Sequence, residues 1–286
     1  MGSIKDYFGL VKFAHTLFAM PFALIAFVYA IAKSGAQFSW LLLAQVVLCM
    51  VFARNTAMGF NRWADRHIDK LNPRTVGREM PAGKISPRGA LAFVAVNALL
   101  FVATASTINS FTAILSPVAL AVVMFYSYCK RFTALAHLVL GFSLGIAPAG
   151  AYIAASGTLT VAPCILSLLV MTWCGGFDII YALQDAGFDR ANGLHSIPAR
   201  FSAAASLRIS MALHAASIVL LVAFAMYCNR TPVLWTGVVL FCAIIVLEHI
   251  LVTPSRQKNI GIAFGTLNGV ASLALSLFTI ADLLLG

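Results

Sequence analysis

Two short segments hold most of the acidic side chains of this 286-residue chain, and their spacing is helical. The first segment contains Asn61, Asp65 and Asp69, in steps of four residues; the second contains Asp178, Asp185 and Asp189, in steps of seven and four. Side chains at such spacings share one face of a helix. These residues include five of the nine Asp and Glu residues in the chain. The spacing therefore predicts two stripes of oxygen-bearing side chains.

Carboxylates beside apolar sequence need a cation close by, because an uncompensated charge in a bilayer is unfavourable by about 3 kcal/mol or more. Oxygen ligands in a loose arrangement suit Mg²⁺, which prefers carboxylates together with phosphate oxygens. Several basic residues suit the phosphate: Arg74, Arg78, Lys84, Lys130 and Arg131. Acids that hold magnesium, with bases around them, indicate a diphosphate. A nucleotide is a weaker alternative, because no Gly-rich Walker-type loop is present.

A second interpretation is structural. Asp65 and Asp69 are also close in sequence to Arg62, Arg66 and Arg74, and could pair with them in a solvated loop. For one segment alone this is about as good an explanation as a metal site. Two such segments, each with Asn or Asp one or two turns deeper, favour the metal site.

Other polar residues have two interpretations each. Tyr126 and Lys130, four residues apart, fit either an interfacial tyrosine with an extended lysine or a pair that contacts the substrate. Arg54 lies seven residues before Asn61 and could pair with an aspartate or bind a substrate carboxylate. The isolated histidines His15, His137 and His214 are expected to be structural.

The composition shows which elements must position these residues. Hydrophobic residues make up 61% of the chain and charged residues 10%, so an integral membrane protein is expected rather than a soluble domain. The six cysteines are scattered and are expected to be buried free thiols. The net charge of +10 could suggest nucleic acid, but the basic residues lie in short loops between apolar runs, so no nucleic-acid partner is expected.

Nine apolar runs are long enough to be membrane-spanning helices. The predicted spans are 15–33, 38–60, 89–107, 111–128, 134–155, 161–183, 204–227, 232–252 and 262–285. The first run contains Pro21 and is expected to be a span, not a cleaved signal peptide. The fold class is therefore an all-α polytopic bundle.

The loops alternate in charge. Those after the second, fourth, sixth and eighth predicted helices are basic, whereas the others are nearly uncharged. The positive-inside rule then places the basic loops and the N-terminus in the cytoplasm. Both acidic segments follow even-numbered helices, so both are expected on the cytoplasmic side. Their weak similarity suggests a single domain, 1–286, with two pseudo-symmetric halves and active-site loops at about 61–88 and 185–203.

Three motifs resemble one family. The segments Asn61 to Asp69, Tyr126 to Arg131 and Tyr181 to Asp189 are similar to the Asn-x-x-x-Asp-x-x-x-Asp, Tyr-x-x-x-Lys and Asp-x-x-x-Asp motifs of the UbiA superfamily of intramembrane prenyltransferases. They appear in the family order. The segment Lys12 to Phe22 resembles a bacterial branch described as 4-hydroxybenzoate polyprenyltransferase-like.

The resemblance implies a nine-helix bundle whose central cavity opens laterally to lipid, and a Mg²⁺-dependent transfer from polyprenyl diphosphate to an aromatic acid. It implies roles for matching residues in this sequence. Magnesium and the diphosphate would be bound by Asn61, Asp65, Asp69, Asp185 and Asp189; the diphosphate would also contact Arg78, Lys84, Tyr126, Lys130 and Arg131. Arg54 would lie near the aromatic substrate. Asp178, two turns before Asp185, is a candidate to orient or deprotonate that acceptor.

The acceptor stays open at this point. A 4-hydroxybenzoate-type acid in ubiquinone biosynthesis and a dihydroxynaphthoate in menaquinone biosynthesis both fit the branch. The expected location is a bacterial cytoplasmic (inner) membrane. A membrane transporter is the alternative from another class, although its charged residues would be expected near mid-membrane on broken helices.

Overall fold

The computed structural model describes residues 2–11, 18–228 and 231–285. Within these residues the chain is 81% helical and contains no strand, which confirms the predicted all-α class. The chain divides into two compact units, one built from Met1–Thr16 and Trp40–Tyr128 and the other from Leu17–Ser39 and Cys129–Gly286.

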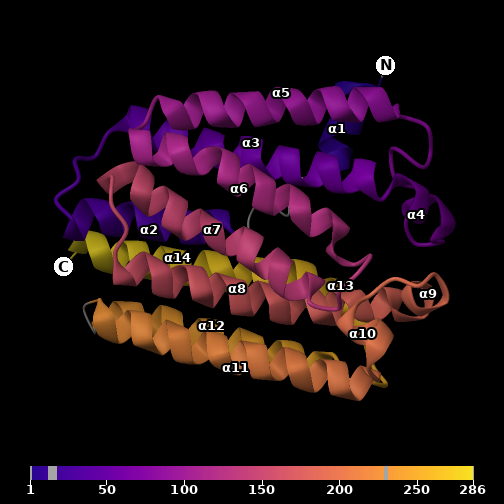
Figure 1. The fold of residues 1–286 in the computed structure, drawn as a ribbon. Coiled ribbons are helices and arrows are strands. Elements are labelled where there is room, and N and C mark those ends of the chain that lie inside the picture. Colours follow the sequence, from indigo (N-terminus) through magenta and orange to yellow (C-terminus); the bar gives the residue numbers. More distant parts are fainter. Residues whose placement is uncertain (1, 12–17, 229–230, 286) are drawn as a thin grey trace. The chain divides into compact units, whose positions relative to one another are not determined.

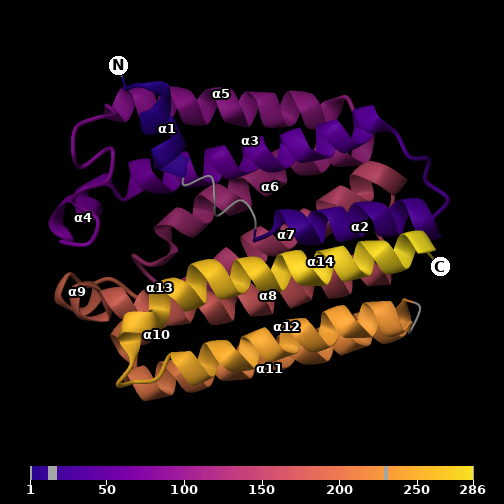
Figure 2. The ribbon, with the colours of Figure 1, turned by 180° about the vertical axis from the view of Figure 1, so that it is seen from behind.

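The first unit contains three long helices and two short ones. The long helices are α3 (Trp40–Ala64), α5 (Pro87–Ser106) and α6 (Ser110–Cys129, of which Cys129 belongs to the second unit). The short helices α1 (Ile4–Val11) and α4 (Arg66–Leu71) lie at one end of α3 and α5 (Figures 1 and 2). Helix α1 lies outside all nine predicted spans.

The second unit is built around α8 (Val161–Ala182), which packs against α7 (Ala136–Ser156) and α11 (Ala203–Tyr227). The other long elements are α2 (Met20–Lys33), α12 (Pro232–Leu251) and α14 (Asn268–Leu285). Short helical turns complete it: η2 (Leu183–Asp185), α9 (Ala186–Ala191), α10 (Ile197–Arg200), η3 (Gln257–Asn259), α13 (Ile260–Ile262) and η4 (Ala263–Leu267). Helices α9, α10 and α13 lie at the end opposite to the C-terminus of α14 (Figures 1 and 2).

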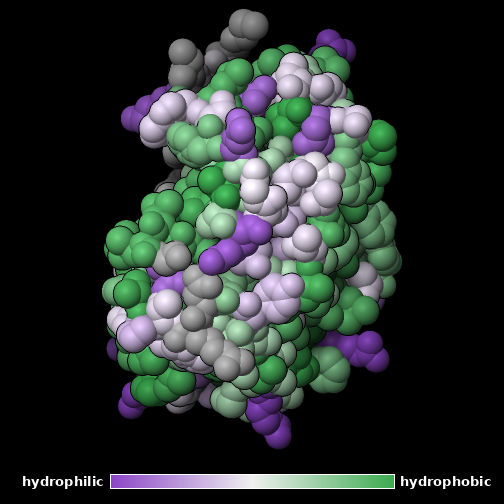
Figure 3. All heavy atoms as spheres, turned by 90° about the vertical axis from the view of Figure 1, so that its left-hand side faces the viewer, coloured by the Kyte–Doolittle hydropathy of each residue, from purple (hydrophilic) through white to green (hydrophobic). Residues whose placement is uncertain are grey.

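Eight helices of the described chain are long and apolar enough to cross a membrane, and α2 is a shorter apolar helix of 14 residues. Each corresponds to one of the nine predicted spans. Many of their large apolar side chains are exposed, including Trp40 at 77%, Leu99 at 72% and Val219 at 68%. In the space-filling view of Figure 3, hydrophobic residues (green) cover much of both sides of the face shown. Such surfaces need lipid around them, so the chain is an integral membrane protein.

Three helix ends differ from the prediction. The start of the predicted span 15–33 lies partly outside the described residues, and α2 begins at Met20, with Pro21 in its first turn, where proline leaves no hydrogen bond broken. Helix α3 continues past residue 60 to Ala64, so Asn61 is on the helix. The predicted span 262–285 is interrupted by η4, a π-helical turn.

Buried polar side chains hold the π-helical turn in place. Asn268 accepts a hydrogen bond from Trp173 Nε1 (3.0 Å) and donates to Glu248 Oε1 (3.0 Å) and to the carbonyl of Ala263 (3.0 Å). The π-turn in turn places Phe264 against Tyr181, with ring centroids 4.2 Å apart. The hydrogen bond from Asn268 to Ala263 satisfies a carbonyl within the turn, where the regular series of helical hydrogen bonds is interrupted.

Helices α7 and α8 approach closely through glycine. A Cβ atom at Gly145 would lie 2.6 Å from the carbonyl oxygen of Ser167, and one at Gly141 would meet the carbonyl of Met171. In a membrane, where lipid removes the hydrophobic drive for helices to associate, such close backbone contact supplies much of the packing energy. The contact fixes α8, which carries Asp178, against α7, which carries His137.

Candidate functional site

The first acidic segment follows one continuous helical path across the junction of α3 and α4. The backbone N–H of Asp65 donates to the carbonyl of Asn61 (2.9 Å), and that of Asp69 donates to the carbonyl of Asp65 (2.8 Å). Asp65 is 3% exposed and Asp69 is 4% exposed. The amide of Asn61 donates to Asp65 Oδ2 at 3.4 Å. The three side chains are thus in neighbouring turns at the end of a membrane helix.

Asp69 is held by basic side chains. Nη1 of Arg78 donates to both of its carboxylate oxygens, at 2.8 and 2.9 Å, and Nη1 of Arg62 lies 3.9 Å from Oδ2. Arg78 lies nine residues from Asp69 and was not among the predicted partners Arg62, Arg66 and Arg74. The buried Asp69 carboxylate is therefore hydrogen-bonded to a guanidinium, which is a group that also binds phosphate well.

The loop that carries Arg78 is fixed on both sides. The hydroxyl of Thr75 donates to the carbonyl of Asp69 (2.9 Å). On the other side, Leu10 of α1 packs in one buried cluster with Met80 and Ile85. Arg74 is exposed; Lys84 is also exposed and interacts electrostatically with Asp6 of α1.

Helix α1 is itself stabilised by a local capping pair. Ser3 donates to Asp6 Oδ2 from both its hydroxyl and its backbone N–H, each at 2.7 Å. These hydrogen bonds from Ser3, the side-chain one first, lower the pKa of Asp6 below its ordinary value. The pair resembles a capping box, in which the N-terminal side chain and the residue three positions later satisfy each other's donors.

The second acidic segment spans three elements: Asp178 is on α8, Asp185 ends the 3₁₀ turn η2, and Asp189 is on α9. The hydroxyl of Ser196 donates to Asp189 Oδ2 (2.9 Å). Asp189 also interacts electrostatically with Lys130 and Asp185.

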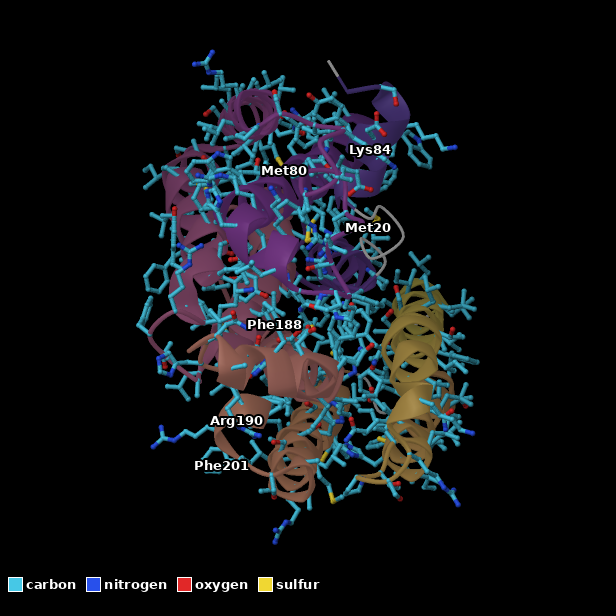
Figure 4. The ribbon with its side chains drawn as sticks, turned by 90° about the vertical axis from the view of Figure 1, so that its right-hand side faces the viewer. Met20, Met80, Lys84, Phe188, Arg190 and Phe201 are labelled. Atoms are coloured by element: carbon cyan, nitrogen blue, oxygen red, sulfur yellow. The ribbon has the colours of Figure 1, made fainter. Side chains whose placement is uncertain are left out.

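Residues 195–200 tie this segment together. The N–H of His195 donates to the carbonyl of Lys130 (2.6 Å), and Ser196 caps α10 by accepting from the N–H of Ala199 (3.1 Å). The guanidinium of Arg190 donates to the carbonyl of Ala199 (3.0 Å). Figure 4 looks onto this end of the unit and labels Phe188 and Arg190 of α9 together with Phe201, which follows α10.

Asp178 contacts His137, a histidine that was predicted to be structural. Oδ2 of Asp178 is 2.7 Å from Nδ1 of His137, and Nε2 of the same ring accepts from the backbone N–H of Ile197 (3.3 Å). His137 is 4% exposed. Its position 41 residues before Asp178 gave no signal in the sequence, because the contact depends on the packing of α7 against α8.

The predicted residues therefore fall into two groups, each within one unit. The first unit brings together Asn61, Asp65, Asp69 and Arg78, and the second brings together Asp178, Asp185, Asp189 and Lys130. Arg54 lies on α3 and Tyr126 on α6, while Arg131 is an exposed residue two positions after the end of α6. Thr75, His137 and Ser196 were not among the predicted site residues.

The donor set of the first group fits a hard cation. Two buried carboxylates and an amide oxygen are the ligand types that Mg²⁺ prefers. In the part of the chain that the structure describes, no three His, Cys, Asp or Glu side chains converge on a complete metal site. Magnesium characteristically keeps water or phosphate oxygens among its ligands, and a partial protein ligand set agrees with that habit.

Known proteins match this chain over most of its length. Residues 19–279 match the model of the UbiA prenyltransferase family. The 4-hydroxybenzoate octaprenyltransferase of Aeromonas salmonicida is 35% identical over 166 residues, which cover 58% of this chain and 57% of that protein. The enzyme of the same name from Yersinia pseudotuberculosis is 30% identical over 217 residues, or 76% of this chain and 75% of that protein. The match to the Aeromonas protein thus spans little more than half of its length.

Solved structures share the fold. A UbiA homologue from Aeropyrum pernix K1 superposes with a TM-score of 0.80 at 31% identity, covering 95% of this chain and 97% of that one. A UbiA homologue from Archaeoglobus fulgidus, solved with GPP and Mg²⁺, has a TM-score of 0.69 at 19% identity and covers 95% and 99% of the two chains. At that lower identity the likeness concerns the fold alone. The family model, the relatives and the fold agree, and this chain belongs to the UbiA prenyltransferase family.

Proposed function

We propose that this protein transfers a polyprenyl group from polyprenyl diphosphate to an aromatic acid of the 4-hydroxybenzoate type, with Mg²⁺ as cofactor. One observation carries the proposal most directly. This chain belongs to the prenyltransferase family, and its Asp65 and Asp69 are buried at the end of a membrane helix, with Arg78 hydrogen-bonded to Asp69. Buried acids paired with a phosphate-binding base, beside lipid, suit a charged head group on an apolar chain.

Four aspartates and one asparagine would hold the metal, namely Asp65, Asp69, Asp185, Asp189 and Asn61. When bound, Mg²⁺ would neutralise charge on the diphosphate and make it a better leaving group. The basic residues would contact the diphosphate oxygens directly, namely Arg74, Arg78, Lys84, Lys130 and Arg131, together with Tyr126. Arg78 would exchange its bonds to Asp69 for bonds to phosphate, since a guanidinium binds both groups in the same two-pronged geometry.

The reaction joins the two substrates as follows. The allylic C–O bond breaks and its electron pair leaves with the diphosphate. A ring carbon of the acceptor then supplies the electron pair for the new C–C bond, and the ring proton passes to a base. Arg54 would bind the acceptor carboxylate, and Asp178 would orient the acceptor or take its proton. The main catalytic effect would be electrostatic: the positive groups lie where negative charge develops on the leaving diphosphate, in a site that lipid shields from water.

The choice of acceptor is supported by the relatives named 4-hydroxybenzoate octaprenyltransferase. The proposed location is a bacterial inner membrane with the acidic loops in the cytoplasm, because the basic residues gather in those loops. A dihydroxynaphthoate uses the same chemistry and is the acceptor to test against it.

The test is a transfer assay with purified protein in lipid nanodiscs. Radiolabelled polyprenyl diphosphate is supplied with 4-hydroxybenzoate or with a dihydroxynaphthoate, with Mg²⁺ or with a chelator. We expect Mg²⁺-dependent product with 4-hydroxybenzoate, and a loss of about 100-fold or more in Asp65→Asn and in Asp185→Asn, in line with loss of a metal ligand.

Asp6→Asn is the matched control, because it removes a partly exposed carboxylate of α1 outside the acidic group, and it should keep nearly full activity. Near-normal transfer by either metal-ligand variant would contradict the metal assignment. Solute counterflow without any prenylated product would favour a transporter instead.

A further inference from the structure

A chain of hydrogen bonds links Asp178 to residues 195–200 through one buried imidazole. Nδ1 of His137 lies 2.7 Å from Asp178 Oδ2, and Nε2 lies 3.3 Å from the backbone nitrogen of Ile197. The histidine comes from α7, the aspartate from α8, and the backbone N–H from the first residue of α10. One side chain thus connects three elements.

The partners determine where the ring proton lies. The backbone N–H of Ile197 is only a donor, so Nε2 of His137 must offer a lone pair. In the neutral ring the proton is then on Nδ1, which donates it to Asp178 Oδ2. Among the described residues, Asp178 Oδ1 makes no hydrogen bond. The geometry therefore directs one carboxylate oxygen to His137 and leaves the other for a ligand.

On the side of Ile197, this series of hydrogen bonds continues to the second acidic segment. Ser196, the neighbour of Ile197, donates its hydroxyl to Asp189 Oδ2 (2.9 Å). His195, one residue earlier, donates its N–H to the carbonyl of Lys130. Residues 195–197 therefore connect Asp178, Asp189 and Lys130 through consecutive positions of one short segment.

We propose that His137 is a positioning residue, which orients Asp178 toward the aromatic acceptor through Nδ1 and fixes residues 195–197 through Nε2. This inference rests on the proposed function. It assigns the two nitrogen atoms different tasks: Nδ1 serves the acceptor through Asp178, and Nε2 serves the diphosphate side through Ser196 and Asp189. If His137 served only to fill space in the core, its two ring nitrogens would not both need hydrogen-bond partners. Here each nitrogen has a partner, and the two partners belong to different elements.

Two substitutions separate the tasks. In His137→Asn the amide nitrogen has the reach of Nδ1, so it can still donate to Asp178 but cannot reach Ile197. In His137→Gln the amide has the reach of Nε2, so its oxygen can accept from Ile197 while the bond to Asp178 is lost. The KM for each substrate is measured separately for both variants, with Arg208→Gln as the control, because it changes an exposed side chain of α11 that lies outside the site.

We expect opposite patterns. His137→Gln should raise the KM for the acceptor or lower kcat by about 10-fold, with the KM for the diphosphate within about twofold, as loss of one charge-assisted hydrogen bond predicts. His137→Asn should raise the KM for the diphosphate by about 10-fold and leave the acceptor KM within about threefold. The control should match the wild-type protein. Equal effects of the two substitutions, or no effect of either, would overturn the proposal.

A second measurement does not depend on turnover by a variant. Nitrogen-15 spectra of histidine-labelled wild-type protein should show His137 as the neutral Nδ1–H tautomer, and Asp178→Leu should shift its Nδ1 signal. An Nε2–H tautomer would overturn the proposal even if both variants fail to fold. Absence of product from wild-type protein with every acceptor would instead refute the proposed function, and the role of His137 with it.

Discussion

At the scale of single residues, the sequence predicted the acidic part of the site around Asp69 but not that Arg78 is its basic partner. The four-residue spacing of Asn61, Asp65 and Asp69 predicted one shared face, and consecutive backbone hydrogen bonds keep them in neighbouring turns. The partner of Asp69 was not predictable in the same way. Arg78 reaches it from a loop whose course depends on Thr75 and on packing against α1, not on any helical period.

Replacing Arg78 with leucine should weaken both binding and folding. The change would leave the Asp69 carboxylate, whose side chain is 6% exposed, without two hydrogen bonds. We expect the free energy of unfolding to fall by about 2 kcal/mol, the usual effect of removing a partner from a buried charged group. The KM for polyprenyl diphosphate should rise about 10-fold. Thermal unfolding in detergent and steady-state kinetics measure the two effects.

The control for this change is Arg88→Leu, which removes an exposed arginine of α5. It should alter stability by less than about 0.5 kcal/mol, as exposed positions do. A wild-type KM in Arg78→Leu would contradict the role of Arg78 in diphosphate binding.

At the scale of elements, apolar run length predicted the long helices well, because a membrane span must be about 20 apolar residues long whatever its tertiary contacts. What it could not predict was the irregular backbone. The π-turn Ala263–Leu267 lies inside the predicted span 262–285, and it is held by Asn268, Trp173 and Glu248, which come from three helices. Helix α1 was missed for a different reason: at eight residues it is too short for a span.

Replacing Asn268 with leucine should destabilise the second unit. The change removes three hydrogen bonds to buried groups, and with about 0.6 kcal/mol for each such bond in a membrane the loss is about 2 kcal/mol. Thr279→Val on the same helix is the control, because its hydroxyl donates only to the carbonyl of Leu275 one turn away. Unfolding by denaturant in mixed micelles compares the two. Equal stability of both variants would mean that the network does not fix α14.

At the scale of the whole molecule, the alternation of basic and uncharged loops predicts the topology. Cysteine variants of exposed positions, in a background without the six native cysteines, should react with a membrane-impermeant maleimide in two classes. Gln37→Cys and Thr160→Cys should react in intact cells, and Arg88→Cys and Gln257→Cys only after permeabilisation. Labelling of Arg88→Cys in intact cells would place the first acidic loop outside and contradict the proposed orientation.

The most direct test asks whether the two acidic segments bind the same magnesium and diphosphate. The measurement is the Mg²⁺-dependent dissociation constant of polyprenyl diphosphate for the wild-type protein, Asp65→Asn, Asp185→Asn and the double variant. One shared site predicts that each single change weakens binding about 10-fold or more, and that the double variant is little weaker than the worse single one, a coupling of about 1 kcal/mol or more. Independent effects that multiply in the double variant, or an unchanged dissociation constant in either single variant, would contradict it.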